Sequence, residues 1–229
     1  SYSTAGSVIS LYVADLDGDG RAEVVAGSED NRAYLLSGDG SLRWYYDVGR
    51  DVSAVCGTDL DGDGLSEVII ASEPGMLYAL RLNGVLLWKY DLHSTPIALY
   101  AGPVSEGNHT YVAAATSGGA LYLVNASGIL SWFYGLEDRL LSACSGDVDG
   151  DRRLELVAGS ASGMLYVITY KGELKEQHEL GNAVDILRMG DIDGDGRAEI
   201  LAGTRGGQLC VYEHTPNHPP LVANPDVTQ

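Results

Sequence analysis

The nine residues Asp15-Leu16-Asp17-Gly18-Asp19-Gly20-Arg21-Ala22-Glu23 return, with small changes, at Asp59, Asp147 and Asp191, always at a multiple of 44 residues. A period of this length is typical of repeat proteins, in which each unit buries its apolar faces against its neighbours. Four copies in one register therefore indicate a repeat architecture with an acidic loop in four of its units.

Each period contains four apolar runs that are too short for helices and are separated by turn residues. In the second copy they are Val52–Thr58, Glu67–Ser72, Met76–Leu82 and Val85–Leu92. Asn83-Gly84, between the last two, is a two-residue hairpin signal. Four antiparallel strands with two apolar faces describe a propeller blade. The sequence therefore predicts an all-β protein, a β-propeller of five four-stranded blades.

The blades are expected at about residues 8–49, 52–93, 96–137, 140–181 and 183–213. In the last blade, no fourth strand is expected after the third one along the chain. Tyr2-Ser3-Thr4 fall in register with the end of a fourth strand, so residues 1–6 are predicted to complete the last blade and close the ring, which removes exposed sheet edges. The alternative is a piece of a larger ring. The proline-rich residues 214–229 are expected to form a linker or tail.

The chain is acidic, with a net charge of -18 over 229 residues. This charge argues against nucleic acid and anionic membrane surfaces as partners. No apolar run approaches the length of a membrane span, so no membrane insertion is expected. The four acidic loops hold 16 of the 32 Asp and Glu residues, and the other acids nearly cancel the 14 Lys and Arg. The acidity therefore indicates cation sites.

In each loop, positions one, three, five and nine supply carboxylates and position seven a backbone carbonyl, while glycines permit the tight turn. Oxygen ligands without His or Cys favour Ca²⁺, and up to four ions are predicted. The candidate ligands are Asp15, Asp17, Asp19, Arg21 and Glu23; Asp59, Asp61, Asp63, Leu65 and Glu67; Asp147, Asp149, Asp151, Arg153 and Glu155; and Asp191, Asp193, Asp195, Arg197 and Glu199.

An EF-hand loop starts in the same way but needs a glutamate at position twelve. The residues there are Ala26, Ile70, Ala158 and Ala202, which excludes an EF-hand. Two of the five repeats depart from the pattern. Arg152 replaces the second glycine in the loop of the fourth repeat, which is expected to strain that turn. In the third repeat the ligand positions are Pro103, Ser105, Gly107 and Tyr111, so no ion is expected there.

The Asp-x-Asp-Gly-Asp-Gly-x-x-Glu loop between strands resembles the FG-GAP (VCBS) repeat of integrin α-subunit propellers and of secreted microbial proteins. The resemblance implies structural Ca²⁺ ions and a role in adhesion, ligand binding or as an accessory module. That family commonly has Asp at position nine. The later part of each repeat, such as Gly75-Met76-Leu77-Tyr78-Ala79-Leu80 with Gly84 and Trp88, is similar to the quinoprotein propeller repeat.

No arrangement typical of catalysis emerges from the sequence. The five histidines are scattered, and no serine lies in a nucleophile motif. Trp44, Trp88 and Trp132 recur at the 44-residue step and are interpreted as packing between blades. Asn108-His109-Thr110 and Asn125-Ala126-Ser127 are glycosylation sequons on expected surface turns, which favours an extracellular or cell-surface location.

These features favour a non-catalytic, extracellular calcium-binding module for adhesion, ligand binding or scaffolding, with a protein or glycan ligand at the cell surface. Two alternatives stay open. One is a self-assembling subunit of an extracellular filament or surface layer. The other is the propeller of a secreted enzyme, either a quinoprotein-like dehydrogenase or a polysaccharide lyase.

Overall fold

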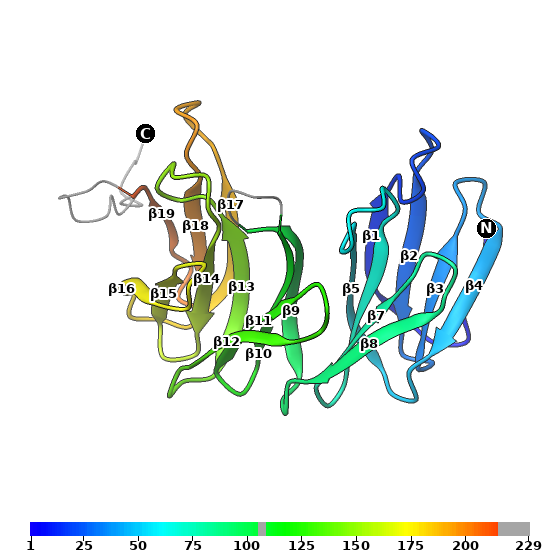
Figure 1. Ribbon diagram of the computed structural model, residues 1–229. Helices are drawn as coiled ribbons and strands as arrows, with labels where there is room; N and C mark the ends of the chain where they lie inside the picture. The colour runs from blue at the N-terminus through cyan, green and yellow to red at the C-terminus, as the bar shows by residue number, and fades with distance from the viewer. Residues whose placement is uncertain (105–108, 215–229) are drawn as a thin grey trace, which may run out of the picture. The chain divides into compact units, whose positions relative to one another are not determined.

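The computed structural model describes residues 1–104 and 109–214, and within them all regular elements are β-strands. The strands form four sheets of four strands and one of three, each antiparallel and in chain order (Figure 1). The first sheet contains β1 (Val8–Ala14), β2 (Glu23–Ser28), β3 (Arg32–Leu36) and β4 (Leu42–Asp47). The second contains β5 (Val52–Thr58), β6 (Glu67–Ser72), β7 (Met76–Leu80) and β8 (Leu86–Asp91).

The later sheets repeat this order. The third contains β9 (Pro96–Pro103), β10 (Thr110–Thr116), β11 (Ala120–Asn125) and β12 (Leu130–Gly135). The fourth contains β13 (Leu140–Gly146), β14 (Glu155–Ser160), β15 (Met164–Ile168) and β16 (Leu174–Glu179). The fifth contains β17 (Val184–Gly190), β18 (Glu199–Thr204) and β19 (Leu209–Tyr212). The predicted all-β propeller fold with five blades is confirmed.

The chain divides into two compact units. The first comprises Ser1–Pro103, His109–Ser117 and Leu121–Phe133, which hold the first two sheets and most of the third. Among the described residues, the second comprises Val104, Gly118–Ala120 and residues 134–214, which include the fourth and fifth sheets. Among the described residues, no helix is long and apolar enough to cross a membrane.

The strand bounds of the second repeat follow the sequence pattern closely. β5 and β6 have the predicted ends, whereas β7 stops at Leu80, two residues earlier than predicted. The reason is the hairpin turn: the backbone N–H groups of Arg81 and Gly84 donate to Val85 and Arg81 carbonyls, which takes these residues out of the ladder. Gly84 has a φ of 83°, as a turn of this type requires.

Each sheet stacks its apolar face on the next within a unit. In the first unit, Leu16, Val25 and Leu35 pack with Val55 and Ile70 of the second sheet. Val55 on β5 is only 6% exposed because the first sheet covers it, whereas Leu11, its repeat equivalent on β1, is 63% exposed. One blade therefore cannot bury its own faces, as the repeat length implies.

The N-terminal residues lie against the first sheet. Tyr2 packs on Tyr34 with ring centroids 5.6 Å apart, and the Ala5 N–H donates to Asp30. Residues 1–4 form no strand, and the fifth sheet has three strands among the described residues. Closure of the ring by the N-terminal strand therefore stays a prediction, as does the boundary at 213. The predicted tail from 215 onward lies outside the described residues.

Two of the recurring tryptophans, Trp44 and Trp88, join neighbouring blades, as predicted. The indole N–H of Trp44 donates to the Leu82 carbonyl at 2.7 Å, and that of Trp88 donates to the Ala126 carbonyl at 2.8 Å. Each ring lies on the hairpin glycine of the next repeat. A Cβ added to Gly84 would be 3.3 Å from the indole of Trp44, and one added to Gly128 would be 2.6 Å from that of Trp88. These indoles are thus part of the packing between sheets.

The cysteines are free thiols, and Cys56 and Cys210 are buried. Burial raises the pKa of the Cys56 thiol to about 12. The same cause raises the pKa of Cys144 to about 12. These two thiols therefore stay protonated at neutral pH and pack as small apolar side chains.

Candidate cation-binding loops

The four acidic loops share one internal hydrogen-bond pattern, anchored by the aspartate at position one. In the first loop, Asp15 Oδ1 accepts from the Gly18 N–H at 2.8 Å and Oδ2 accepts from the Gly20 N–H at 2.9 Å. The equivalent aspartates of the other loops, Asp59, Asp147 and Asp191, accept from the same two loop positions. Side chain and backbone thus close the turn locally, as short acidic side chains often do.

The aspartates at positions three and five accept N–H groups two residues further on. Asp17 Oδ1 accepts from Asp19, and Asp19 Oδ1 accepts from Arg21 at 2.8 Å. Leu65, Arg153 and Arg197, at position seven of the other loops, donate in the same way. These N–H contacts fix the backbone at position seven, while the predicted carbonyl ligation by Arg21, Leu65, Arg153 and Arg197 stays a prediction.

The glutamate at position nine is the buried member of each set. Glu23, Glu67, Glu155 and Glu199 are 1%, 2%, 2% and 5% exposed. In each of these four loops its Oε2 accepts the backbone N–H of loop position two, at 3.0, 2.9, 3.1 and 2.7 Å respectively. The longer side chain of Glu can reach back to this donor and still present Oε1. A buried carboxylate oxygen without a partner destabilises the fold, so the stability of each loop depends on the group that Oε1 contacts.

The structure brings the predicted carboxylates together in all four loops. Oxygen atoms lie within 4.8 Å of one another in four groups, which are Asp15, Asp17 and Asp19; Asp59, Asp61 and Glu67; Asp147, Asp149 and Glu155; and Asp191, Asp193 and Glu199. Each group holds three of the four predicted carboxylates of its loop, and those left out are Glu23, Asp63, Asp151 and Asp195. The sets consist of hard oxygen donors, which suit Ca²⁺.

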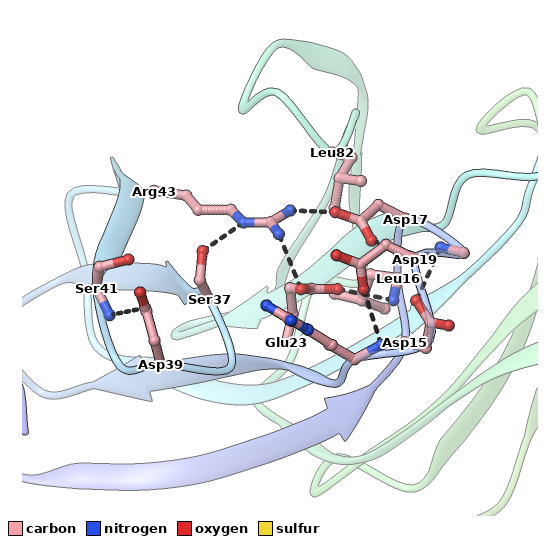
Figure 2. Close-up of polar contacts among 12 residues, drawn as sticks. Asp15, Leu16, Asp17, Asp19, Glu23, Ser37, Asp39, Ser41, Arg43 and Leu82 are labelled. Atoms are coloured by element: carbon pink, nitrogen blue, oxygen red, sulfur yellow. Dashed lines mark hydrogen bonds and ion pairs between the residues drawn. The ribbon is translucent and has the colours of Figure 1, made fainter.

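In the first repeat a cation from the fourth strand enters the acidic loop. Arg43 on β4 donates from Nη1 to Asp17 Oδ2 at 2.8 Å and from Nη2 to Glu23 Oε1 at 2.9 Å (Figure 2). Its Nε donates to the Ser37 hydroxyl at 2.8 Å. The hydrogen bond from Arg43 lowers the pKa of Asp17. The guanidinium therefore neutralises the buried carboxylate from within the chain.

The fourth repeat has the same arrangement with lysine. Lys175 on β16 contacts Asp149, and its Nζ lies 3.6 Å from Glu155 Oε1. Burial opposes the ionisation of Asp149, but the hydrogen bond from Lys175 leaves its pKa below the ordinary value. For Glu155, burial is the larger effect and raises its pKa to about 7. Lys175 occupies the same repeat position as Arg43.

The second repeat has Leu87 at that position, and no ion pair to its loop carboxylates occurs within residues 1–104 and 109–214. Burial raises the pKa of Glu67, and the neighbouring Asp61, Asp63 and Asp59 raise it further. A cavity of about 290 Å³ adjoins this loop, lined by Asp63, Leu65, Glu67, Arg81, Leu82 and Asn83. A divalent cation would relieve the repulsion among these carboxylates.

The fifth repeat is the most acidic. Glu199 Oε1 is buried and lacks a hydrogen-bond partner. Glu213, which directly follows β19, places a carboxylate oxygen within 4.8 Å of Asp193 and Asp195. Among the described residues, this loop also lacks an ion pair.

Arg152 departs from the glycines at position six of the other loops. Its φ is 63°, in the left-handed region that Gly20, Gly64 and Gly196 adopt at the same loop position. Its N–H still donates to Asp147 Oδ2 at 2.8 Å, so the turn is preserved. The predicted strain in this turn is therefore present in the backbone.

In the third repeat, Pro103 and Tyr111 are strand residues of β9 and β10, and Tyr111 pairs with Gly102. Ser105 and Gly107 lie outside the described residues, as does the sequon asparagine Asn108. Asn125 ends β11, where its Oδ1 accepts the N–H groups of Ser127 and Ile129 at 3.0 Å. Its glycosylation stays a prediction.

Three residues near the loops were not among the sequence candidates: Arg43, Lys175 and Glu213. A signal for the first two exists in the 44-residue register, because both stand one residue before the recurring tryptophan position. Glu213 has no such signal. It directly follows β19, and only the folded sheet places it beside the loop between β17 and β18.

Comparison with known families agrees with this geometry. FG-GAP-like repeats match residues 15–70 and 147–202, the two segments that each include complete acidic loops. The λ-carrageenase β-propeller domain matches residues 48–134. None of the curated proteins compared with the chain matches its sequence.

Solved propellers share the fold at low sequence identity. BBS1N, in a crystal structure of its complex with ARL6DN soaked with lead, superposes with a TM-score of 0.72 at 22% identity, covering 95% of this chain and 69% of that one. Sqt1 of Saccharomyces cerevisiae superposes with a TM-score of 0.75 at 16% identity, covering 91% of this chain and 60% of its own length. The chain therefore spans about two thirds of the length of these structures or less.

Proposed function

Because the chain is a β-propeller built from FG-GAP-like repeats, we propose that it is a calcium-stabilised, non-catalytic module that binds a protein partner outside the cell. The metal part rests on one observation above all. In the second and fifth loops, buried glutamates stand among aspartates with no ion pair among the described residues. Such carboxylate groups are stabilised by a divalent cation.

Calcium would act on the architecture. Each loop joins the first two strands of a blade, and its buried glutamate starts the second strand. An ion that binds positions one, three and nine would tie the strand ends together and offset the mutual repulsion of the carboxylates. Calcium at millimolar concentration occurs outside cells, where even weak sites of this type fill. The two sequons favour the same location.

The partner is proposed to be a protein. Turns on a rigid sheet scaffold are suited to recognition, since they vary without disturbing the packing. One hollow of about 380 Å³ in the first unit is lined by turn residues Asn31, Gly49, Arg50, Asp51, Glu73 and Pro74. BBS1N, a propeller of similar fold, was crystallised in complex with ARL6DN. Glycan binding and self-assembly remain the alternatives from the sequence.

Isothermal titration calorimetry with Ca²⁺ on the metal-free protein tests the metal part, together with thermal melting in EDTA and in millimolar Ca²⁺. We expect saturable calcium binding and a higher melting temperature with calcium. Mg²⁺ at the same concentration is the control, and it should give a smaller increase. Identical melting in EDTA and calcium would contradict the proposal.

A second candidate function follows from the match of residues 48–134 to the λ-carrageenase propeller domain. This match favours an accessory domain of a polysaccharide-degrading enzyme. Affinity electrophoresis in gels containing carrageenan distinguishes the two functions. Retarded migration that persists in EDTA would favour the carbohydrate role over the protein-binding role.

A further inference from the structure

We propose that Glu213 and the fifth-repeat loop form a five-carboxylate cation site, and that this site binds Ca²⁺ more tightly than the other three loops do. The inference rests on the proposed calcium binding and goes beyond it, since Glu213 lies outside the repeated loop. It would make the fifth repeat the first to fill as calcium rises.

The first step is a comparison of one atom across the repeats. The Oε1 atom of Glu23 accepts from Arg43, and the Oε1 atom of Glu155 lies near Lys175. Both oxygens thus face a cation that also contacts an aspartate of the loop. In the fifth repeat the corresponding atom, Glu199 Oε1, is buried without a partner. Among the described residues, Glu199 therefore lacks the positive charge that Arg43 and Lys175 supply in the first and fourth repeats.

The second step is the position of Glu213. The residues at the same repeat position are Ser37, Arg81, Asn125 and Thr169, so only the fifth repeat has an acid there. Two groups of oxygens meet in this loop, one from Asp191, Asp193 and Glu199 and one from Asp193, Asp195 and Glu213. Asp193 belongs to both groups. The two groups therefore adjoin at the Asp193 carboxylate.

The third step concerns three cations of the second unit that lie at the fourth loop. Lys175 contacts Asp149, and Arg153 lies 3.7 Å from Asp151. Arg197 belongs to the fifth loop, but its side chain lies over Gly150, where an added Cβ would be 3.2 Å from its Nε. Within residues 134–214, no ion pair reaches the five carboxylates.

These observations set the order of affinity. A calcium ion entering the first or fourth loop must compete with a cation that already binds two carboxylates. In the fifth loop it meets more negative charge and no such competitor. Calcium affinity in oxygen sites varies with the number of charged ligands over several powers of ten. We expect the fifth site to bind at least about tenfold more tightly, which corresponds to about 1.4 kcal/mol.

The test is a calcium titration of the wild type, of the three loop variants Glu213→Gln, Asp193→Asn and Asp61→Asn, and of one control variant. We expect the tightest binding event to weaken about tenfold or more in Glu213→Gln and to vanish in Asp193→Asn. It should persist in Asp61→Asn, which alters the second loop. Glu179→Gln is the matched control, because Glu179 is an exposed carboxylate on β16 of the same unit.

Two outcomes would overturn the inference in different ways. If Glu213→Gln binds its first ion as tightly as the wild type, or if Asp61→Asn removes the first ion, the fifth-repeat site is wrong while calcium binding stands. If equilibrium dialysis finds no calcium on the wild type, both the proposed metal function and this inference fail. Circular dichroism of each variant establishes that the strands are intact.

Discussion

The first and fourth loops have the same nine-residue pattern as the second and fifth, yet they are electrically different. Arg43 and Lys175 reach the buried glutamate of the first and fourth loops. The second repeat has Leu87 at this position, and the fifth loop gains Glu213 instead. The motif supplies the carboxylates, but residues elsewhere in the blade decide whether those carboxylates meet a cation from the chain.

This difference separates two ways of stabilising one turn. An ion pair within the chain works at any calcium concentration, although desolvation of its charges limits its net gain. A loop without that pair has little to offset its repulsion until a metal binds. The stability of the first and fourth loops is therefore expected to depend less on calcium than that of the second and fifth loops.

The largest expected effect comes from disabling both loops that lack an ion pair. At a thousandfold excess of ligand over Kd, one bound ion stabilises the folded state by about 4 kcal/mol, which corresponds to about 8–16 °C for a chain of this size. We predict that EDTA lowers the melting temperature of the wild type by such an amount. The double variant Asp61→Asn/Asp193→Asn should lose most of this response in scanning calorimetry.

The matched control for that experiment is Asp17→Asn/Asp149→Asn, which alters the loops with an internal cation. Its response to EDTA should stay close to that of the wild type. An equal loss in both double variants would mean that the four loops do not differ in the predicted way.

Replacing Arg43 should make the first loop behave like the second and fifth loops, which lack an ion pair. Arg43→Leu reproduces the residue of the second repeat and leaves Glu23 without its partner. We expect the metal-free protein to lose about 1–3 kcal/mol, because a buried acceptor is then unsatisfied. Calcium affinity at this loop should rise about tenfold in a calorimetric titration, since no guanidinium competes. Arg43→Lys keeps the charge, so both the loss of stability and the rise in calcium affinity should be smaller than in Arg43→Leu.

The reverse substitution sharpens the comparison from the other side. Leu87→Arg places a guanidinium at the position from which Arg43 reaches the first loop. It should weaken calcium binding at the second loop by about tenfold, a change of about 1.4 kcal/mol. Leu87→Met is the control for packing, and it should leave the titration unchanged. Unaltered calcium binding in Leu87→Arg would show that an arginine at this repeat position is not enough to compete with calcium.

The smallest effect concerns the backbone of the fourth loop. Arg152 has a φ of 63°, where the other loops have glycine. We predict that Arg152→Gly raises stability by about 1 kcal/mol or less, because relief of the left-handed conformation is partly offset by the entropy of glycine. Thermal melting should show an increase of a few degrees at most. The neighbouring Arg153→Gly should instead lower it, since Arg153 lies 5.0 Å from the Tyr170 ring centroid. A lower melting temperature for Arg152→Gly would contradict the strain argument.

The 44-residue pattern is enough to predict the five sheets, the strand ends of the second repeat at Val52–Thr58 and Glu67–Ser72, and the place of each acidic loop. It could do so because these features depend on neighbours close in the chain. Apolar runs alternate with turns, and Asp15 bonds N–H groups only three and five residues away.

The contacts of each loop with the rest of its blade depend on how the chain folds in space. Arg43 contacts Asp17 and Glu23 from 26 and 20 residues further along, and Glu213 approaches Asp193 across the fifth sheet. Such contacts arise when strands pair and bring distant side chains to one end of a blade. The charge balance of a buried carboxylate depends on its surroundings in space, and a nine-residue pattern does not contain them.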